Sequence, residues 1–416
     1  MTESLTSNSA TAAETTTTPN GQEQPKPMGW EGQTFLVGDL VYVRGIEEGD
    51  AKYVTAWRDS LYPTSTARAE TIIKEDIPKE WNQRKNTMML VRKSDDRVVG
   101  AVVVRGSFWS PATWVTVRID PLIGNSSTLA ADAIALVIPW LAEESQKAVI
   151  RIELADDQTE EIAAAEKIGM QRVARYREAL WRLGGRHDSV IYEYLNPKWV
   201  ANLGDPNAVE LERSGTGQPR PVIRSVAVEG DPPPHAVMVG PRVYLRANQK
   251  EDAELYARWS RRETETFWAG GRGVNSPVDV GHWIQEEHKT EPRGNITWGA
   301  CLRENDEVLG DVGIYDVDFI HRTGETGSWI GRPEYRGGGY GSEAKNLLLE
   351  YCFERLGLHM IRSHVIFPNT RSAAALRKQG YTEAGRYNWD YNLHGTYGNA
   401  VVFDLLAEEW WALPRA

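Results

Sequence analysis

The residues with the clearest chemical use are four glycines in the stretch RGGGYG, which runs from Arg336 to Gly341 just before an apolar sequence of helical period. Backbone N–H groups of a glycine-rich loop that enters a helix N-terminus point at one spot, and the helix dipole adds positive potential there. Each glycine costs about 0.5–1 kcal/mol relative to alanine in a regular element, so the cluster indicates a use that outweighs this cost. The chemistry that such a loop offers is the binding of a phosphate or diphosphate group.

Three kinds of phosphate loop compete for this stretch. A P-loop needs GxxxxGK[ST], and no Lys follows the glycines in that register. A dinucleotide loop needs GxGxxG or GxGxxA, which residues 339–344 match, but the next predicted strand, LHMIRSHVIF, lacks the acidic residue that contacts the ribose. That loop should also follow the first strand of its unit, whereas this one follows the fourth. The third pattern, R-x-x-G-x-G starting at Arg336, matches the sequence and needs neither a following Lys nor an acidic residue on the next strand.

A second motif follows the next predicted strand. It consists of Asn369 and Ser372, an Ala-rich helix, and then Lys378-Gln379-Gly380-Tyr381. Together, R-x-x-G-x-G and N-x-x-S…K-x-G-Y resemble the GCN5-related N-acetyltransferase (GNAT) superfamily, and within it the branch that contains ribosomal-protein N-terminal acetyltransferases. The resemblance covers residues 237–408 and, more faintly, residues 35–196.

This resemblance implies that acetyl-CoA is the co-substrate. In the family the loop holds the diphosphate, and the pantetheine arm lies in a gap between two strands that splay apart. Carried over residue by residue, the cofactor-binding set is Trp329, Ile330, Arg336, Gly337, Gly338, Gly339, Tyr340, Gly341, Ser342, Asn369 and Ser372. Asn369 is also well placed as a helix N-cap, and both roles can hold together.

The implied reaction is direct transfer of acetyl from acetyl-CoA to an amine, without a covalent enzyme intermediate and without a metal. It needs a base for the amine, donors that polarise the thioester carbonyl, and an acid for the departing thiolate. Glu325 matches the position of a carboxylate in this branch and would act as the base through water. Asp316 and Asp318 are alternatives, and a solvated strand-end carboxylate would explain Glu325 equally well.

The predicted acid is Ser372. Many family members carry a Tyr seven residues after the Asn, but here that position is Leu376, so the chain departs from the pattern. Ser372 could instead serve as a second helix cap, and Tyr387 and Tyr391 are later alternatives.

The predicted acceptor-pocket residues are Phe267 and Trp268 in a stretch that could form a lid, and Tyr391 in the last hairpin. Ordinary packing would explain them as well. We expect the acceptor to be a small-molecule amine or a peptide N-terminus. The alternative function is a non-catalytic acyl-CoA sensor or scaffold protein that kept the loop and lost turnover.

The elements that position these residues occur twice. The segment VGDLVYVR at 37–44 is similar to VGPRVYLR at 239–246. In the same order, Trp57 corresponds to Trp259, and KIGM at 167–170 corresponds to KQGY at 378–381. Taken with this repeat, the resemblance implies an α/β (α+β) fold class with two tandem GNAT folds, each a mixed and mostly antiparallel sheet flanked by helices. The expected domains are a disordered tail at 1–34, a degenerate GNAT-like domain at 35–196, an irregular linker at 197–236 and an acetyl-CoA-binding GNAT domain at 237–416.

The first copy lacks the phosphate loop. Where the second copy has PEYRGGGYG, the first has PLIGNSSTL, which keeps Gly124 and loses the Arg. Gln158 and Glu161 stand where the second copy has Asn369 and Ser372. We therefore expect the first half to keep the fold without binding acetyl-CoA.

Composition bounds the remaining possibilities. A net charge of −11 argues against a protein that binds nucleic acid through phosphate contacts. Two cysteines are too few for a disulfide framework, and the sequence shows no run of about 20 apolar residues that would span a membrane. We expect a soluble cytoplasmic protein, without nucleic-acid or membrane partners, that is either a monomer with an internal pseudo-dimer or a homodimer.

Overall fold

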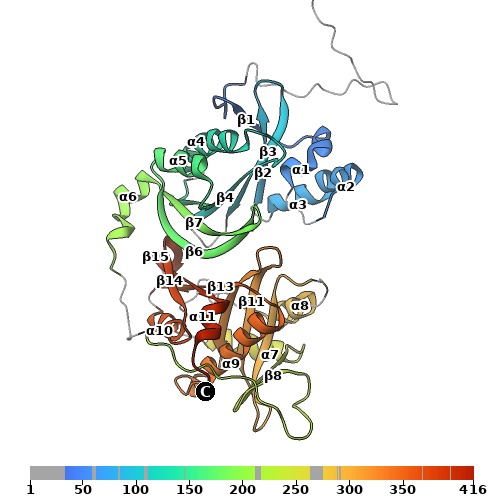
Figure 1. Cartoon of the computed structure of the whole chain (residues 1–416), viewed down its shortest axis with the longest axis vertical. Coiled ribbons are helices and arrows are strands. Elements are labelled where there is room, and N and C mark those ends of the chain that lie inside the picture. The colour runs from blue at the N-terminus through green and yellow to red at the C-terminus, as the bar shows by residue number, and fades with distance from the viewer. Residues whose placement is uncertain are drawn as a thin grey trace, which may run out of the picture.

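The computed structural model describes residues 33–58, 62–82, 85–106, 111–144, 146–210, 217–262, 275–287, 289, 292–367, 369–393 and 395–416. In these residues the strands form one continuous sheet (Figure 1). Its order is β1-β2-β3-β4-β5-β7-β6-β14-β15-β13-β12-β11-β10-β9-β8. The two halves of the chain therefore meet in the middle of the sheet.

In the described part of the N-terminal half there are seven strands and five α-helices. The strands are β1 (Val41–Arg44), β2 (Lys85–Arg92), β3 (Arg97–Gly106), β4 (Ala112–Ile119), β5 (Val149–Ala155), β6 (Gln171–Arg182) and β7 (Gly185–Leu195). The helices are α1 (Val54–Trp57), α2 (Thr66–Thr71), α3 (Ile77–Asn82), α4 (Ser126–Glu144) and α5 (Thr159–Lys167).

The C-terminal half follows a connecting segment that contains helix α6 (Pro197–Leu203). Its strands are β8 (Ala236–Val239), β9 (Val243–Ala247), β10 (Ile296–Leu302), β11 (Val308–Asp318), β12 (Thr323–Ile330), β13 (Met360–Ile366), β14 (Thr382–Leu393) and β15 (Thr396–Leu406). Its helices are α7 (Asp252–Arg262), α8 (Pro277–Glu287), α9 (Tyr340–Glu350), α10 (Thr370–Lys378) and α11 (Ala407–Ala412). A π-helical segment, Tyr351–Arg355, extends α9.

The two halves repeat one topology. From one edge the order is β1-β2-β3-β4-β5-β7-β6, and from β9 at the other side it is β9-β10-β11-β12-β13-β15-β14. In each half the fourth and fifth strands, β4 with β5 and β12 with β13, pair in parallel, while the other neighbours pair antiparallel. The predicted fold class, a mixed and mostly antiparallel sheet with flanking helices, is confirmed.

Helices cover both faces of the sheet in the C-terminal half. Leu347 and Leu348 of α9 and Leu376 of α10 pack in one core with strand residues such as Ile361. Tyr256 and other residues of α7 pack on the opposite face. Since alternate residues of a strand point to opposite faces, this division tells which side each strand residue serves.

The connection between the halves is more ordered than predicted. The segment predicted as irregular contains α6 and a short 3-10 turn at 206–208. Further along, the Arg220 backbone N–H donates to the Lys378 carbonyl at 2.8 Å, and the Val222 N–H donates to the Pro414 carbonyl at 2.8 Å. The segment therefore lies against the end of α10 and the C-terminus.

The halves join where β6 meets β14. Gly385 pairs with Ala174 and has φ +147°, and a Cβ there would lie 2.2 Å from the Val173 carbonyl oxygen, so this close approach requires glycine. Beside it, the hydroxyls of Tyr176 and Tyr387 lie 2.9 Å apart.

One described helix, α4, is long and apolar enough to cross a membrane by length and composition alone. In the structure it lies on the sheet, with Leu129, Ile134 and Ile138 buried in the core of the N-terminal half. This is the packing of a core helix.

Candidate active site

A pocket of about 420 Å³ lies where the glycine loop, the end of β12 and α10 meet. It brings together all the predicted cofactor-binding residues except Gly338 and Tyr340. Its lining is Arg220, Ser328, Trp329, Ile330, Tyr335, Arg336, Gly337, Gly339, Gly341, Ser342, Asn369, Arg371, Ser372, Ala374, Ala375, Leu376, Lys378 and Gln379.

The glycine loop has a backbone that other residues would not adopt easily. Gly337 and Gly339 both have φ +86°, and Gly339 is the N-cap of α9. The first N–H groups of α9 have no partner within the helix, so an anion at this end of the pocket would be favoured. Tyr340 instead packs under Arg242, whose guanidinium lies 4.5 Å from the ring centroid, and Gly338 accepts a hydrogen bond from Arg242.

Arg336 is held by the strand that it follows. Its Nε donates to the Ile330 carbonyl at 2.9 Å while the residue lines the pocket. This bond fixes the start of the loop relative to the end of β12.

The strands β12 and β13 pair over only three residues. Their parallel ladder runs from Thr323 with Met360 to Glu325 with Arg362. Beyond it a side-chain bond from Ser363 to the Thr326 carbonyl, 2.9 Å, is the next link between them. The following residues, Ser328 to Ile330, line the pocket, so the strands part where the predicted pantetheine gap should lie.

Asn369 and Ser372 lie at the start of α10. The Asn369 side chain accepts the Ser372 backbone N–H at 3.2 Å, which is an N-cap, and both residues line the pocket. The cap does not use the Ser372 hydroxyl, which leaves this oxygen available for the chemistry predicted for it.

Glu325 does not line the pocket. Its neighbour Thr326 faces the core under α9 and α10, where its hydroxyl lies 2.7 Å from that of Tyr381, so Glu325 points to the opposite face of the sheet. There its carboxylate pairs with Arg362 at 3.4 Å. The structure thus places the predicted base and the predicted acid on different faces, on either side of the opening between β12 and β13.

The predicted acceptor residues are not brought together. Phe267 and Trp268 lie outside the described residues. Tyr391 is buried in the final hairpin opposite Gly398, and burial followed by the nearby charge of Asp390 raises its pKa to about 12. A buried, neutral phenol in this position supports the packing interpretation of Tyr391.

Three cations that line the pocket are not among the residues predicted to bind the cofactor. Arg371 and Lys378 belong to α10, and Arg220 comes from the connecting segment. The first two could have been found from their positions on the helix after Asn369. Arg220 gives no such signal, because the turn of the chain that brings it to Lys378 is set by distant contacts.

Substituting Arg220 tests whether it binds a phosphate. We expect Arg220→Ala to raise the KM for acetyl-CoA about tenfold, since hydrogen bonds to charged groups contribute about 1.5–3 kcal/mol. The KM for 3′-dephospho-acetyl-CoA should change much less. Arg224→Ala is the matched control, because that Arg pairs with Glu350 and Glu354 instead of lining the pocket. Equal losses with both co-substrates would show that Arg220 does not contact the 3′-phosphate.

Comparison with known proteins places this site in a family. Residues 242–382 match the model of the acetyltransferase (GNAT) domain. Over 168 residues the chain is 31% identical to the uncharacterized N-acetyltransferase YoaA of Bacillus subtilis (strain 168), covering 40% of this chain and 93% of that protein. The chain belongs to the GNAT acetyltransferase family.

Other GNAT relatives match over shorter stretches or with lower identity. "Putative ribosomal N-acetyltransferase YdaF" of Bacillus subtilis (strain 168) is 28% identical over 111 residues, 27% of this chain and 60% of that protein, so the chain spans about three fifths of its length. Spermidine N(1)-acetyltransferase of Vibrio cholerae is 24% identical and is covered over 82% of its length, by 32% of this chain. The crystal structure of spermidine N-acetyltransferase from Vibrio cholerae in complex with CoA and spermine is 19% identical, with a TM-score of 0.36, over 41% of this chain and 98% of that one.

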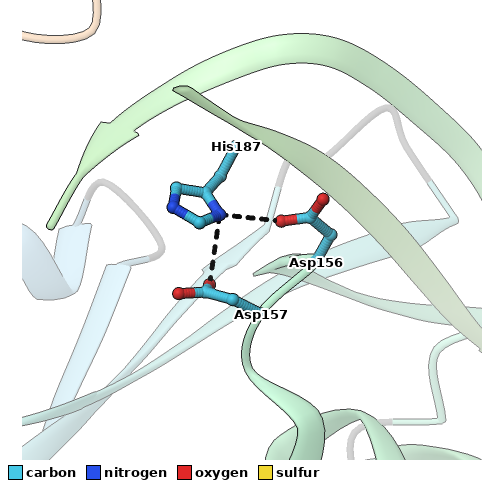
Figure 2. A group of neighbouring side chains, drawn as sticks. All are labelled: Asp156, Asp157 and His187. Atoms are coloured by element: carbon cyan, nitrogen blue, oxygen red, sulfur yellow. Dashed lines mark hydrogen bonds and ion pairs between the residues drawn. The ribbon is translucent and has the colours of Figure 1, made fainter. Parts of the chain in front are cut away.

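One cluster of possible metal ligands shares no residue with the GNAT pocket. Figure 2 shows the His187 ring directed at Asp156 and Asp157, with Nδ1 3.0 and 3.9 Å from their carboxylate oxygens. Arg182 pairs with Asp157 at 3.0 Å, so part of the negative charge is already compensated. By donor type the three residues could hold a cation, but the same contacts describe an exposed ion-pair cluster.

Proposed function

We propose that the C-terminal half binds acetyl-CoA in the 420 Å³ pocket and transfers its acetyl group directly to an amine. The observation that carries this proposal is the meeting, in one pocket, of the glycine loop, the Asn369 cap and the separated end of β12. Family membership supplies the reaction class, and the pocket supplies a place for the co-substrate.

The residues present fit this co-substrate. The backbone N–H groups of the loop and the start of α9 would hold the diphosphate, and Arg371, Lys378 and Arg220 would hold the remaining phosphate charge. The exposed edge of β12 from Ser328 to Ile330 would pair with the amide groups of the pantetheine arm. The Ser372 hydroxyl is the proposed proton donor to the departing thiolate.

We further propose that the N-terminal half is a degenerate copy that does not bind acetyl-CoA. At the position of the Asn369 cap, Gln158 bonds to the Ala155 N–H at 2.8 Å and to Glu161 at 3.2 Å. Glu161, which replaces Ser372, is buried, and its negative charge would repel a phosphorylated ligand. The structure of this half is kept because it completes the shared sheet.

For the acceptor we propose a small amine or a peptide N-terminus. The names of two relatives, one a spermidine and one a ribosomal acetyltransferase, represent these two classes. A thiol-release assay with acetyl-CoA and a panel of polyamines, aminoglycosides and peptides tests the proposal. Release that depends on one class of amine is the expected result. Acetyl-CoA binding without release for any amine would favour the acyl-CoA sensor instead.

A further inference from the structure

His364 is a titratable side chain at the opening between β12 and β13. No role in the proposed acetyl transfer has been assigned to it so far. Ile361 and Val365 of β13 pack in the core under α9 and α10, so His364 points to the other face of the sheet. It lies two residues beyond Arg362, where the β12–β13 ladder ends. On β12, Gly327 lies two residues beyond Glu325, the last residue of the same ladder, and the Tyr315 ring lies 3.1 Å from where a Cβ of Gly327 would stand.

The imidazole of His364 is fixed by a carboxylate. Its Nε2 lies 2.6 Å from an oxygen of Asp390, and its side chain is 29% exposed. An ionised carboxylate accepts, so Nε2 carries the proton and Nδ1 keeps its lone pair. Nδ1 makes no hydrogen bond to any residue in the described part of the chain.

The carboxylate is in turn held by the N-terminal half. Arg151 of β5, 1% exposed, bonds through its Nη1 to the other Asp390 oxygen, and its Nε bonds to Glu193 at 2.7 Å. Its Nη2 also donates to the Asn388 carbonyl at 2.8 Å. Burial alone would raise the pKa of Asp390, but the charges of Arg151 and His364 hold it well below its ordinary value.

The charges around His364 determine whether its pKa is raised or lowered. Burial alone would lower its pKa, yet Asp390 and then Glu325 outweigh burial and the opposing charge of Arg151, so the pKa is raised above its ordinary value near 6.5. The ring of Tyr387 lies beside the imidazole, with 6.3 Å between the two centroids.

We propose that His364, oriented by Asp390 and Arg151, takes the proton from the acceptor amine during acetyl transfer. This inference rests on the proposed function. The ammonium form of the acceptor loses one proton to Nδ1, and the nitrogen lone pair attacks the thioester carbon. The C–N bond forms, the C–S bond breaks, and a second proton from nitrogen ends on the thiolate, leaving the amide and CoA. His364 then releases its proton to water.

In this arrangement the N-terminal half helps to position the proposed base, although it lacks the phosphate loop. Arg151 and Asp390 are positioning residues, and Arg151 belongs to the half that lacks the phosphate loop. Glu325 is a weaker candidate for the base because its carboxylate is already paired with Arg362.

The test is the pH dependence of kcat/KM with an amine that the wild type acetylates. In the wild type, kcat/KM should rise with pH through an acidic limb whose apparent pKa lies above 6.5, because the raised pKa of His364 keeps the base protonated to higher pH. His364→Ala should lower kcat/KM about 100-fold and abolish this limb, as expected for loss of a general base. Asp390→Asn should lower kcat/KM about tenfold and move the limb to lower pH, a shift that a merely structural role would not produce. Acetyl-CoA affinity, measured by calorimetry, should stay unchanged in both variants.

His359→Ala is the matched control. His359 also bonds to a carboxylate of the other half, Glu178, at 2.7 Å, but it lies before β13, away from the opening. It should leave kcat/KM and its pH profile unchanged. If His364→Ala keeps the limb while Glu325→Gln removes it, or if Asp390→Asn leaves the limb in place, the inference is overturned. If the wild type binds acetyl-CoA but releases no thiol with any amine, the proposed function fails first, which is a distinguishable outcome.

Discussion

A Gly339→Val variant is expected to bind acetyl-CoA about 100-fold more weakly than the wild type, or not at all. Gly339 has φ +86°, a backbone conformation that costs a β-branched residue about 1–3 kcal/mol. Gly339 is the N-cap of α9, beside the N–H groups proposed to bind the diphosphate, and a Cβ there would lie 3.3 Å from Nη2 of Arg242, so the loop or Arg242 would have to shift. Loss of hydrogen bonds from these donors to a charged ligand lowers the binding free energy by about a further 1.5–3 kcal/mol. Each 1.4 kcal/mol corresponds to about a tenfold change in affinity. Isothermal titration with acetyl-CoA measures the loss.

Gly124→Val is the matched control for this prediction. Gly124 is the glycine that remains in the corresponding segment of the N-terminal half, at the position of Arg336, and a Cβ there meets no atom within 4 Å. We expect this variant to bind acetyl-CoA like the wild type. Full binding by Gly339→Val would mean that the loop is not the diphosphate site.

An Arg151→Met variant is expected to lose about 3–5 kcal/mol of folding stability. Arg151 is 1% exposed and bonds to two carboxylates, so without it Glu193 would be left buried without a counter-charge and Asp390 would keep only His364. Breaking a buried pair from one side typically has this cost. The guanidinium also lies 4.5 Å from the centroid of the Tyr387 ring, so the loss reaches the junction between the halves. The midpoint of urea unfolding measures the effect.

Arg175→Met provides the comparison for Arg151. Arg175 also pairs with a carboxylate, that of Asp188, but its side chain is 60% exposed. Exposed pairs contribute about 0–1 kcal/mol, so little change is expected. Similar unfolding midpoints for the two variants would show that the Arg151 network does not hold the halves together.

The local elements of the C-terminal half could be predicted from the sequence because their signals are local. The Ala-rich helix predicted after Asn369 is found at Thr370–Lys378. The glycine loop could also be located, since positive φ angles at Gly337 and Gly339 are a property of residue type. The repeated strand order followed from repeated sequence patterns.

Long-range contacts could not be predicted in the same way. Arg151 and Asp390 are 239 residues apart, and no pattern in either segment indicates that they meet. The backbone pairing that joins both halves into one sheet is at Gly385, and no local sequence pattern indicates this role. The opposite placement of Glu325 and Ser372 likewise follows from strand register, which a short motif does not encode.

Calorimetric titration of the full chain with acetyl-CoA tests the central claim most directly, namely that the chain carries the fold twice and the acetyl-CoA site once. We expect one binding site per chain, lost in Gly339→Val and retained in Gly124→Val. Two sites per chain, or one site that survives Gly339→Val, would contradict it.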